Sequence, residues 1–297
     1  MTLKDTLSKY DFKFKKKFGQ NFISDPHLLQ KIASAAEITS DDIVVEIGPG
    51  AGTLTRELAN EARAVIAIEI DPELIPIIEE NMAGYDNFHL LCADALTIDL
   101  DALVAEKTGS TAPYKIVANL PYYITTPLVM HFLEQGFHIS RIVIMVQKEV
   151  AQRFQAAPGT KEYGAVTVAL NYYGQVSLAF IVSRHLFTPQ PEVDSAVIDI
   201  RIYDQKPYTA DDPDMFRRLI KAAFSQRRKT LNNAIKTAGV PPEIMAQAFK
   251  DCDIDPKRRG ETLSVAEFTA LANRVTTLTR QAKGDDPAIV PDEQNQR

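Results

Sequence analysis

The run Asn119-Leu120-Pro121-Tyr122 combines residue types that could recognise and activate an aromatic amine. The lone pair of an amine such as adenine N6 is delocalised into the ring, which makes the nitrogen a poor nucleophile. Two acceptors, the Asn119 side-chain oxygen and the Leu120 backbone carbonyl, could accept hydrogen bonds from its two N–H groups and favour a pyramidal nitrogen. Pro121 restricts φ and stiffens the loop, and Tyr122 offers a face on which a base can stack. The run predicts a catalytic loop for methyl transfer to such an amine, provided that the fold places it beside a methyl donor.

A second group of residues has the composition of a nucleoside-binding site. Glu46–Gly52 reads E-I-G-P-G-A-G, and alternate glycines, Gly48 and Gly50 among them, let the backbone turn tightly and approach a ligand. Glu69 follows Gly50 by 19 residues and could accept hydrogen bonds from both ribose hydroxyls, whereas Asp94 could accept one from an adenine amine. The spacing G-x-G-x-G differs from the G-x-G-x-x-G of dinucleotide-binding proteins. These residues favour S-adenosylmethionine over NAD and require no metal ion.

Most of these residues lie at the ends of apolar runs that we expect to be strands of one sheet. Continuous apolar runs suit strands buried on both faces, and the intervening Thr53–Asn60 and Pro72–Met82 are typical of crossover helices. We therefore predict an α/β fold: a doubly wound, mostly parallel seven-stranded sheet, Rossmann-like as in class I methyltransferases. The predicted strands are Asp42–Gly48, Val65–Ile70, Phe88–Asp94, Tyr114–Leu120, Arg141–Gln147, Val176–Val182 and Ala196–Tyr203, the last two forming an antiparallel pair at one edge.

Helix signals recur after residue 203. Asp212-Pro213 is a cap with a first-turn proline, Gly239–Pro242 is a break, and Ser264 with Glu267 is a capping box. The polar, acidic end of the chain is typical of disorder. The predicted organisation is a catalytic domain over residues 1–206 with a basic segment at 1–20, a small all-α RNA-binding domain over 207–281, and a disordered tail over 282–297.

The chain has a formal net charge of −6, yet its basic residues cluster in two places. Residues 1–20 hold six Lys and two Asp, and residues 216–236 hold seven Lys or Arg and no acid. A phosphate backbone is attracted by such local patches, although either run alone could be a solvated face. The candidate RNA-binding residues are Arg217, Lys221, Arg227, Arg228 and Lys229, of which Arg217, Lys221 and Arg228 would lie near one face at helical spacing.

The sequence also carries expectations about the compartment. The first 17 residues contain no apolar stretch, and no apolar run reaches the ~18 residues of a membrane span. The two cysteines, Cys92 and Cys252, lie far apart and lack metal-ligand spacing. We expect a cytoplasmic protein without a secretory signal, a membrane partner or a metal ion.

Taken with further stretches, these motifs resemble the ribosomal RNA small-subunit adenine dimethyltransferases, the KsgA family, up to about residue 280. The resembling stretches are Lys17–Phe22, Glu46–Gly52, Ala67–Asp71, Asn119–Thr126, Gln147–Val150, Phe187–Ser195, Ala223-Phe224 with Arg227–Lys229, and Arg259–Leu263. The resemblance implies transfer of four methyl groups from S-adenosylmethionine to N6 of two adjacent adenosines in the 3′-terminal hairpin of 16S rRNA. It implies an immature 30S-type particle as the partner during late small-subunit biogenesis, S-adenosylhomocysteine as the product, and a monomeric enzyme.

The resemblance also implies site residues. Gln20, Asn21 and Ile23 would contact the cofactor beside the glycine-rich turn, Glu69, Asp94 and Asn119. The family usually has Leu where this chain has Ile23, and a backbone contact would make that difference unimportant. Phe187 would be a second aromatic side chain near the target base, or else a core residue of a proline-rich loop.

Four alternatives stay open on sequence alone. A methyltransferase of the antibiotic-resistance type, acting on 23S rRNA adenine, typically reads Asn-Ile-Pro-Tyr and is strongly basic, whereas this chain has Leu120 and a pI near 5.5. A DNA adenine methyltransferase would share the loop chemistry, but Gln20-Asn21 and the helical domain argue against it. A small-subunit assembly checkpoint factor could use the same residues with methylation secondary. A dehydrogenase would bind nicotinamide instead.

Overall fold

A computed structural model describes residues 8–15, 20–226 and 228–284 of the chain. The chain divides into two compact units: the first runs to Ala156 and resumes over Leu170–Lys206, and the second holds Ala157–Ala169 and continues from Pro207. The chain returns to the second unit at residue 207, the residue at which the helical domain was predicted to begin. The segment 157–169 differs from the predicted ranges, because it belongs to the second unit.

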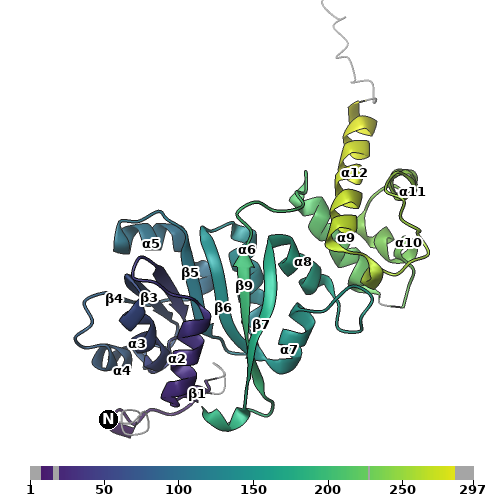
Figure 1. Cartoon of the computed structure of the whole chain (residues 1–297). Helices are drawn as coiled ribbons and strands as arrows, with labels where there is room; N and C mark the ends of the chain where they lie inside the picture. Colours follow the sequence, from purple (N-terminus) through teal and green to yellow (C-terminus); the bar gives the residue numbers. More distant parts are fainter. Residues whose placement is uncertain (1–7, 16–19, 227, 285–297) are drawn as a thin grey trace, which may run out of the picture. The chain divides into compact units, whose positions relative to one another are not determined.

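The first unit is built on a seven-stranded sheet in the order β4-β3-β2-β5-β6-β9-β7 (Figure 1). Its strands are β2 (Ile43–Ile47), β3 (Ala64–Glu69), β4 (Phe88–Cys92), β5 (Tyr114–Asn119), β6 (Ile139–Gln147), β7 (Gly174–Val182) and β9 (Ser195–Ile202). The first five strands are parallel to one another, and β9 pairs antiparallel with both β6 and β7. The predicted fold class is confirmed, and β7 with β9 is the predicted antiparallel pair, although β9 lies between β6 and β7.

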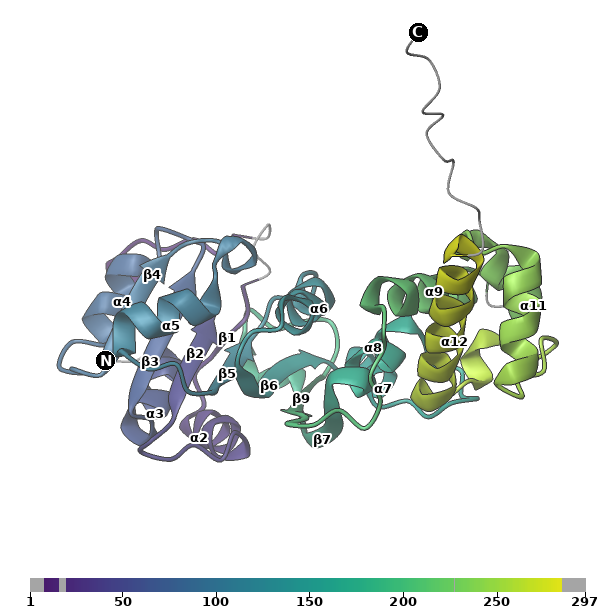
Figure 2. The same cartoon turned by 90° about the horizontal axis from the view of Figure 1, so that it is seen from above.

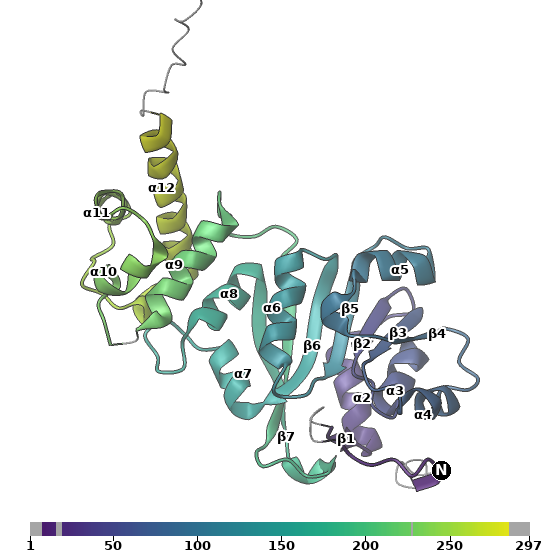
Figure 3. The ribbon, with the colours of Figure 1, turned by 180° about the vertical axis from the view of Figure 1, so that it is seen from behind.

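The helices cover both faces of this sheet, which explains why its central strands are apolar throughout. Every residue of β2 and β3 is buried. Figure 2 shows α2 and α3 on one side of the sheet and α5 and α6 on the other, and in Figure 3, seen from behind, α6 lies in front of the sheet. The helices are α2 (Pro26–Ala35), α3 (Thr53–Glu61), α4 (Ile75–Asn81), α5 (Leu100–Thr108), α6 (Thr125–Gln135) and α7 (Lys148–Phe154), with single 3-10 turns η2 (Ala95–Thr97) and η3 (Arg184–Leu186).

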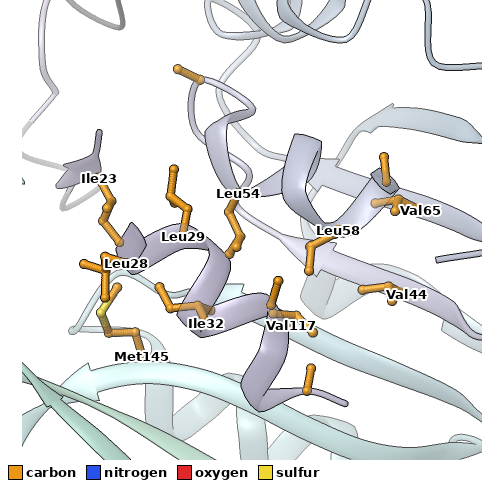
Figure 4. Close-up of a cluster of buried hydrophobic side chains, with 14 of the residues drawn as sticks. Ile23, Leu28, Leu29, Ile32, Val44, Leu54, Leu58, Val65, Val117 and Met145 are labelled. Atoms are coloured by element: carbon orange, nitrogen blue, oxygen red, sulfur yellow. The ribbon is translucent and has the colours of Figure 1, made fainter. Parts of the chain in front are cut away.

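Two short strands outside the main sheet were not predicted. Strand β1 (Phe22–Ile23) pairs antiparallel with β8 (Phe187–Thr188), with Ile23 opposite Phe187. Both strands are anchored by a hydrophobic cluster that also includes buried side chains of α2, α3 and β5. Figure 4 shows Ile23 beside side chains of α2 in this cluster. The pairing therefore fixes the residues around position 21 against the main sheet.

The ion pair between Arg141 and Asp199 is buried in the first unit. Arg141 on β6 donates to both carboxylate oxygens of Asp199 on β9, each at 2.8 Å, and both side chains are less than a tenth exposed. The same guanidinium donates to the backbone carbonyls of Ala35 and Ala36 and pairs with Glu37. These contacts satisfy the buried guanidinium and tie the end of α2 to the edge half of the sheet.

The second unit is helical. Asp212 caps α9 and accepts from the backbone N–H of Asp214 and Met215, and Ser264 and Glu267 form a reciprocal capping box, so both predicted caps are confirmed. The described elements are α9 (Pro213–Ser225), α10 (Leu231–Ala234), η4 (Ile235–Ala238), α11 (Pro242–Asp251), η5 (Gly260–Thr262) and α12 (Val265–Gly284), while α8 (Ala165–Tyr173) spans the division between the units. Residues 282–284 belong to α12 rather than to a disordered tail, and the rest of that predicted tail lies outside the described residues. Within the described ranges, no helix has the length and apolarity needed to cross a membrane.

Candidate active site

One pocket in the first unit brings together nearly all the residues predicted to act in catalysis or cofactor binding. It lies at the carboxyl ends of β2, β3, β4 and β5, where the strand order reverses and where doubly wound sheets bind their ligands. The predicted residues that line it are Gln20, Asn21, Ile23, Gly48, Gly50, Glu69, Asp94, Asn119, Leu120, Pro121 and Tyr122. Phe187 is the one predicted catalytic residue that is absent from the lining.

The glycine-rich turn after β2 serves two different purposes. Gly48 and Gly50 both adopt positive φ, +66° and +62°, which favours glycine. A Cβ at Gly48 would meet no atom of the described chain within 4 Å, so this backbone borders open space that a ligand can approach. A Cβ at Gly50 would lie 2.6 Å from Cε1 of Phe22. Gly50 is therefore needed so that β1 can pack on the turn, which sequence reasoning did not foresee.

Glu69 is a buried carboxylate that braces this turn. It is 4% exposed, its Oε2 accepts from the backbone N–H of Gly50 at 3.3 Å, and its Oε1 accepts from the backbone N–H of Asp71 at 2.8 Å. Burial raises the pKa of Glu69 to about 7, and the nearby charge of Asp71 adds to this, while the two backbone N–H groups oppose it. Each carboxylate oxygen has a second acceptor site, so Glu69 can still receive a pair of hydroxyl groups.

Two further acids line the pocket. Asp94 caps η2 through its Oδ1, which accepts from the Leu96 backbone N–H at 3.0 Å, and this contact fixes the orientation of its carboxylate. Glu46, the acid that leads the glycine-rich turn, is 1% exposed, and its Oε2 has no hydrogen-bond partner among the described residues. Burial raises the pKa of Glu46 to about 8, and the charge of Glu69 contributes. Glu46 is therefore held mainly as the neutral acid at pH 7.

The side chain of Asn119 has a defined orientation at the end of β5. Its Nδ2 donates to the backbone carbonyl of Asn21 at 3.0 Å. Because a carbonyl can only accept, the amide nitrogen must face Asn21, and the amide oxygen is left as the acceptor on the other side. Asn119 therefore presents the atom that the predicted activation of an aromatic amine requires.

The loop after Asn119 is fixed by hydrogen bonds to the start of α6 and to β9. The side chain of Leu120 is buried, and the carbonyl of Pro121 accepts from the Ile124 backbone N–H and the Thr125 hydroxyl, both at 3.1 Å. The hydroxyl of Tyr122 lies 2.7 Å from Oγ of Ser195, a fully buried residue that begins β9. Burial raises the pKa of Tyr122, so its hydroxyl stays protonated. The hydrogen bond to Ser195 fixes the ring of Tyr122 at the pocket wall, a role for Ser195 that the sequence did not indicate.

Phe187 lies elsewhere. It is 4% exposed and belongs to the hydrophobic cluster behind β1, where it pairs with Ile23 across the β1–β8 strands. This is the core position that the sequence left open as the alternative to base stacking. Its described contacts hold β1 in place.

Gln20 contacts a residue that sequence reasoning missed. Its Nε2 donates to Oδ2 of Asp71 at 3.0 Å, and its Oε1 accepts from the backbone N–H of Lys15 at 2.8 Å. The Lys15 ammonium group also contacts Asp71, at 2.7 Å. Asp71 follows Glu69 by two residues in the sequence, and that proximity was the available signal.

No group of three or more His, Cys, Asp or Glu side chains in the described parts of the chain could hold a metal ion.

The predicted RNA-binding residues lie in the second unit, and their arrangement differs from a single helical face. Arg217 and Lys221 are one turn apart on α9, and Arg217 pairs with Asp214. The helix ends at Ser225, so Arg228 and Lys229, both exposed, lie in the turn after it rather than on the same helix. Arg227 lies outside the described residues. The prediction that Arg228 shares the helical face of Arg217 is wrong, because Gln226 leaves the helical conformation.

Comparisons with known proteins place this site in context. A family model described as ribosomal RNA adenine dimethylase matches residues 11–277. The chain is 47% identical to the ribosomal RNA small subunit methyltransferase A of Clostridioides difficile, over 92% of this chain and 95% of that protein. The enzyme of the same name from Lactococcus lactis is 46% identical over 93% and 95%.

Two solved structures are similar at 27% identity. A dimethyladenosine transferase from Plasmodium falciparum superposes with a TM-score of 0.74, covering 87% of this chain and 98% of that one. The 23S rRNA methyltransferase ErmE superposes with a TM-score of 0.64, covering 86% and 99%.

Proposed function

Because the chain belongs to the ribosomal RNA adenine dimethylase family, as its sequence predicted, we propose that it dimethylates N6 of two adjacent adenosines in the 3′-terminal hairpin loop of 16S rRNA. The small-subunit enzymes are 46–47% identical to this chain over nearly their whole length, against 27% for the 23S rRNA methyltransferase. This difference favours the small-subunit substrate over the large-subunit alternative.

The orientation of Asn119 is the observation that carries the proposed chemistry. Its amide nitrogen is committed to Asn21, so its oxygen can accept one N–H of the target amine, and the Leu120 carbonyl would accept the other. Both contacts strengthen as the nitrogen becomes pyramidal and its lone pair turns toward the methyl group, so they favour the transition state over the ground state. No general base is needed, because the amine proton can leave after the transfer.

The pocket fits S-adenosylmethionine as the cofactor. The open space beside Gly48 allows close approach of a ligand to the backbone, Glu69 would accept the ribose hydroxyls, and Asp94 would accept from the adenine amine. Gln20, Asn21 and Ile23 would close the pocket from the β1 side. When bound, the cofactor supplies a methyl group on a sulfonium, which needs no metal ion for activation.

Tyr122 would hold the target base. Its ring lines the pocket and its hydroxyl is fixed by Ser195, so an unstacked adenine can lie on the ring, an interaction worth about 1–3 kcal/mol. Tyr123, which is 61% exposed, lies next along the loop and offers a second aromatic surface to the RNA. Phe187 would contribute to base stacking only if it left its buried position.

The basic run over residues 216–236, in the second unit, would bind the rRNA backbone. Reversing the charge of Lys221 and Arg228 together should weaken binding to small-subunit particles and reduce the magnitude of the salt slope by about 1 for each phosphate that is no longer neutralised. Lys250→Glu, at an exposed site on α11 outside this run, is the matched control for the single variant Lys221→Glu, because each of the two reverses one charge. Equal slopes for the wild type and the double variant would contradict this role.

The proposed partner is an immature 30S-type particle, met by a monomer of this protein in the cytoplasm where the rRNA matures. The decisive experiment is primer extension across the 3′ hairpin of unmethylated small-subunit rRNA after incubation with enzyme and S-adenosylmethionine. We expect stops at two adjacent adenosines with the wild type and none with Asn119→Ala. Full dimethylation by Asn119→Ala would refute the catalytic assignment. In a parallel reaction with 23S rRNA, stops there without stops in the 3′ hairpin of 16S rRNA would favour the large-subunit alternative.

A further inference from the structure

A buried carboxylate outside the pocket holds the backbone that faces Asn119. The side chain of Asp71 is 0% exposed and does not line the pocket. Its Oδ1 accepts from Lys15 Nζ at 2.7 Å and its Oδ2 from Gln20 Nε2 at 3.0 Å. Gln20 in turn accepts the backbone N–H of Lys15 at 2.8 Å, which closes a ring of three contacts. The ring fixes the chain immediately before Asn21.

The next residues carry this constraint into the active site. Asn21 follows Gln20 directly, and its carbonyl is the acceptor that sets the amide orientation of Asn119. On the other side of Asn21, Phe22 packs against Gly50, and the carbonyl of Ile23 accepts from the Thr53 hydroxyl at 3.0 Å. The carbonyl of Asn21 is therefore held between the β1 contacts on one side and the Asp71 contacts on the other.

The backbone of Asp71 reaches the cofactor side of the pocket as well, because its N–H donates to Glu69 Oε1 at 2.8 Å. The carboxylate and the backbone of one residue thus contact both the segment that orients Asn119 and the acid proposed to bind ribose. A neutral amide at this position would retain the backbone contact and remove the buried one of the two carboxylates that pair with Lys15, the other being the exposed Glu73.

We propose that Asp71 is a positioning residue, whose carboxylate holds Gln20 and Asn21 so that the amide oxygen of Asn119 faces the target amine. This inference rests on the proposed function and adds a residue to it. Removal of the carboxylate loosens the chain on one side of Asn21, so the Asn119 amide can turn over and present N–H groups where an acceptor is needed. A displacement of about 1 Å can reduce a rate by about 100-fold, so we expect Asp71→Asn to lower the rate of methyl transfer by about 10- to 100-fold.

The test compares single-turnover methyl transfer by full-length variants, with tritiated S-adenosylmethionine and small-subunit particles lacking the methylation. Asp71→Asn and Gln20→Ala remove the same contact from its two sides, so one of them reports even if the other does not fold. Glu80→Gln is the matched control, because Glu80 binds Lys9 and Tyr10 of the same N-terminal segment through exposed contacts on α4. We expect Glu80→Gln to stay within about twofold of the wild-type rate, since exposed ion pairs contribute little.

A double-mutant cycle separates positioning from general damage. If Asp71 acts through Asn119, adding Asp71→Asn to Asn119→Ala should change the rate by less than about twofold, whereas independent effects would multiply. The cofactor dissociation constant of Asp71→Asn, measured by equilibrium dialysis, should change by a smaller factor than its rate.

Each contrary result has a distinct meaning. Multiplying effects in the cycle, or a wild-type rate in both Asp71→Asn and Gln20→Ala, would overturn the positioning role while leaving the proposed function in place. An unchanged rate in Asn119→Ala alone would overturn the proposed chemistry and the positioning role together.

Discussion

Glu69 should make cofactor binding depend on pH, because burial raises the pKa of its carboxyl to about 7. The ionised carboxylate can accept both ribose hydroxyls, whereas the protonated form has one acceptor fewer. Ligand affinity should therefore be full above the raised pKa and fall as the pH drops through it. With this pKa, about nine-tenths of Glu69 is ionised at pH 8 and about one-tenth at pH 6, so the apparent dissociation constant should rise about tenfold over that interval.

The assay is isothermal titration calorimetry at pH 6, 7 and 8 with 5′-deoxy-5′-methylthioadenosine. This probe keeps the adenine and the ribose and lacks the amino-acid group, whose own titration would obscure the result. The binding curve of Glu69→Gln should be weak and independent of pH. Glu46→Gln should keep the tenfold change, which excludes the second buried carboxyl with a raised pKa as its source.

Two results would refute this reasoning. One is a wild-type affinity that stays constant from pH 6 to pH 8. The other is a Glu69→Gln variant with the same pH dependence as the wild type, since the titrating group would then lie elsewhere.

Three further predictions concern stability and packing. The raised pKa of Glu46 means that the wild type loses stability as the pH rises from 4.5 toward 8, so Glu46→Gln should be more stable than the wild type at pH 7 by about 3 kcal/mol. A difference in the free energy of unfolding between the two proteins, measured in urea, that stays constant from pH 5 to 8 would contradict this. Asp199→Ala leaves the buried guanidinium of Arg141 with the exposed carboxylate of Glu37 and two backbone carbonyls as partners, and should lower the free energy of unfolding by about 3 kcal/mol; a loss below about 1 kcal/mol would show that the contact with Asp199 is dispensable. Gly50→Ala should displace Phe22 and weaken cofactor binding more than Gly84→Ala, which shares a positive φ without the close contact; equal affinities in the two variants would argue against the packing role.

The sequence predicted those parts of the molecule that depend on local pattern and chain topology. Continuous apolar runs marked the strands, and their parallel order placed Glu69, Asp94 and Asn119 at one edge of the sheet. The capping box of Ser264 and Glu267 was predictable because both partners lie within one helical turn.

The contacts that orient these side chains were not predictable, because they join residues far apart in the sequence. Strands of two residues, such as β1 and β8, have no periodicity to read, so the burial of Phe187 depended on tertiary packing. The amide of Gln20 gave no indication that it contacts Asp71, 51 residues away. Arg141 begins a predicted strand, and its contacts with Asp199, with Glu37 and with the last carbonyls of α2 explain how a guanidinium can be buried there.

The pairing of β1 with β8 also bears on how the protein is made. Phe22 and Ile23 line the proposed cofactor pocket, and they pair with Phe187–Thr188, which are synthesised much later, near the end of the first unit. A nascent chain that ends before residue 187 can form the glycine-rich turn and the central strands but lacks the partner strand that anchors Asn21. We therefore expect the proposed cofactor pocket to be completed late in synthesis, once nearly the whole first unit has emerged, and truncated chains should not compete for S-adenosylmethionine.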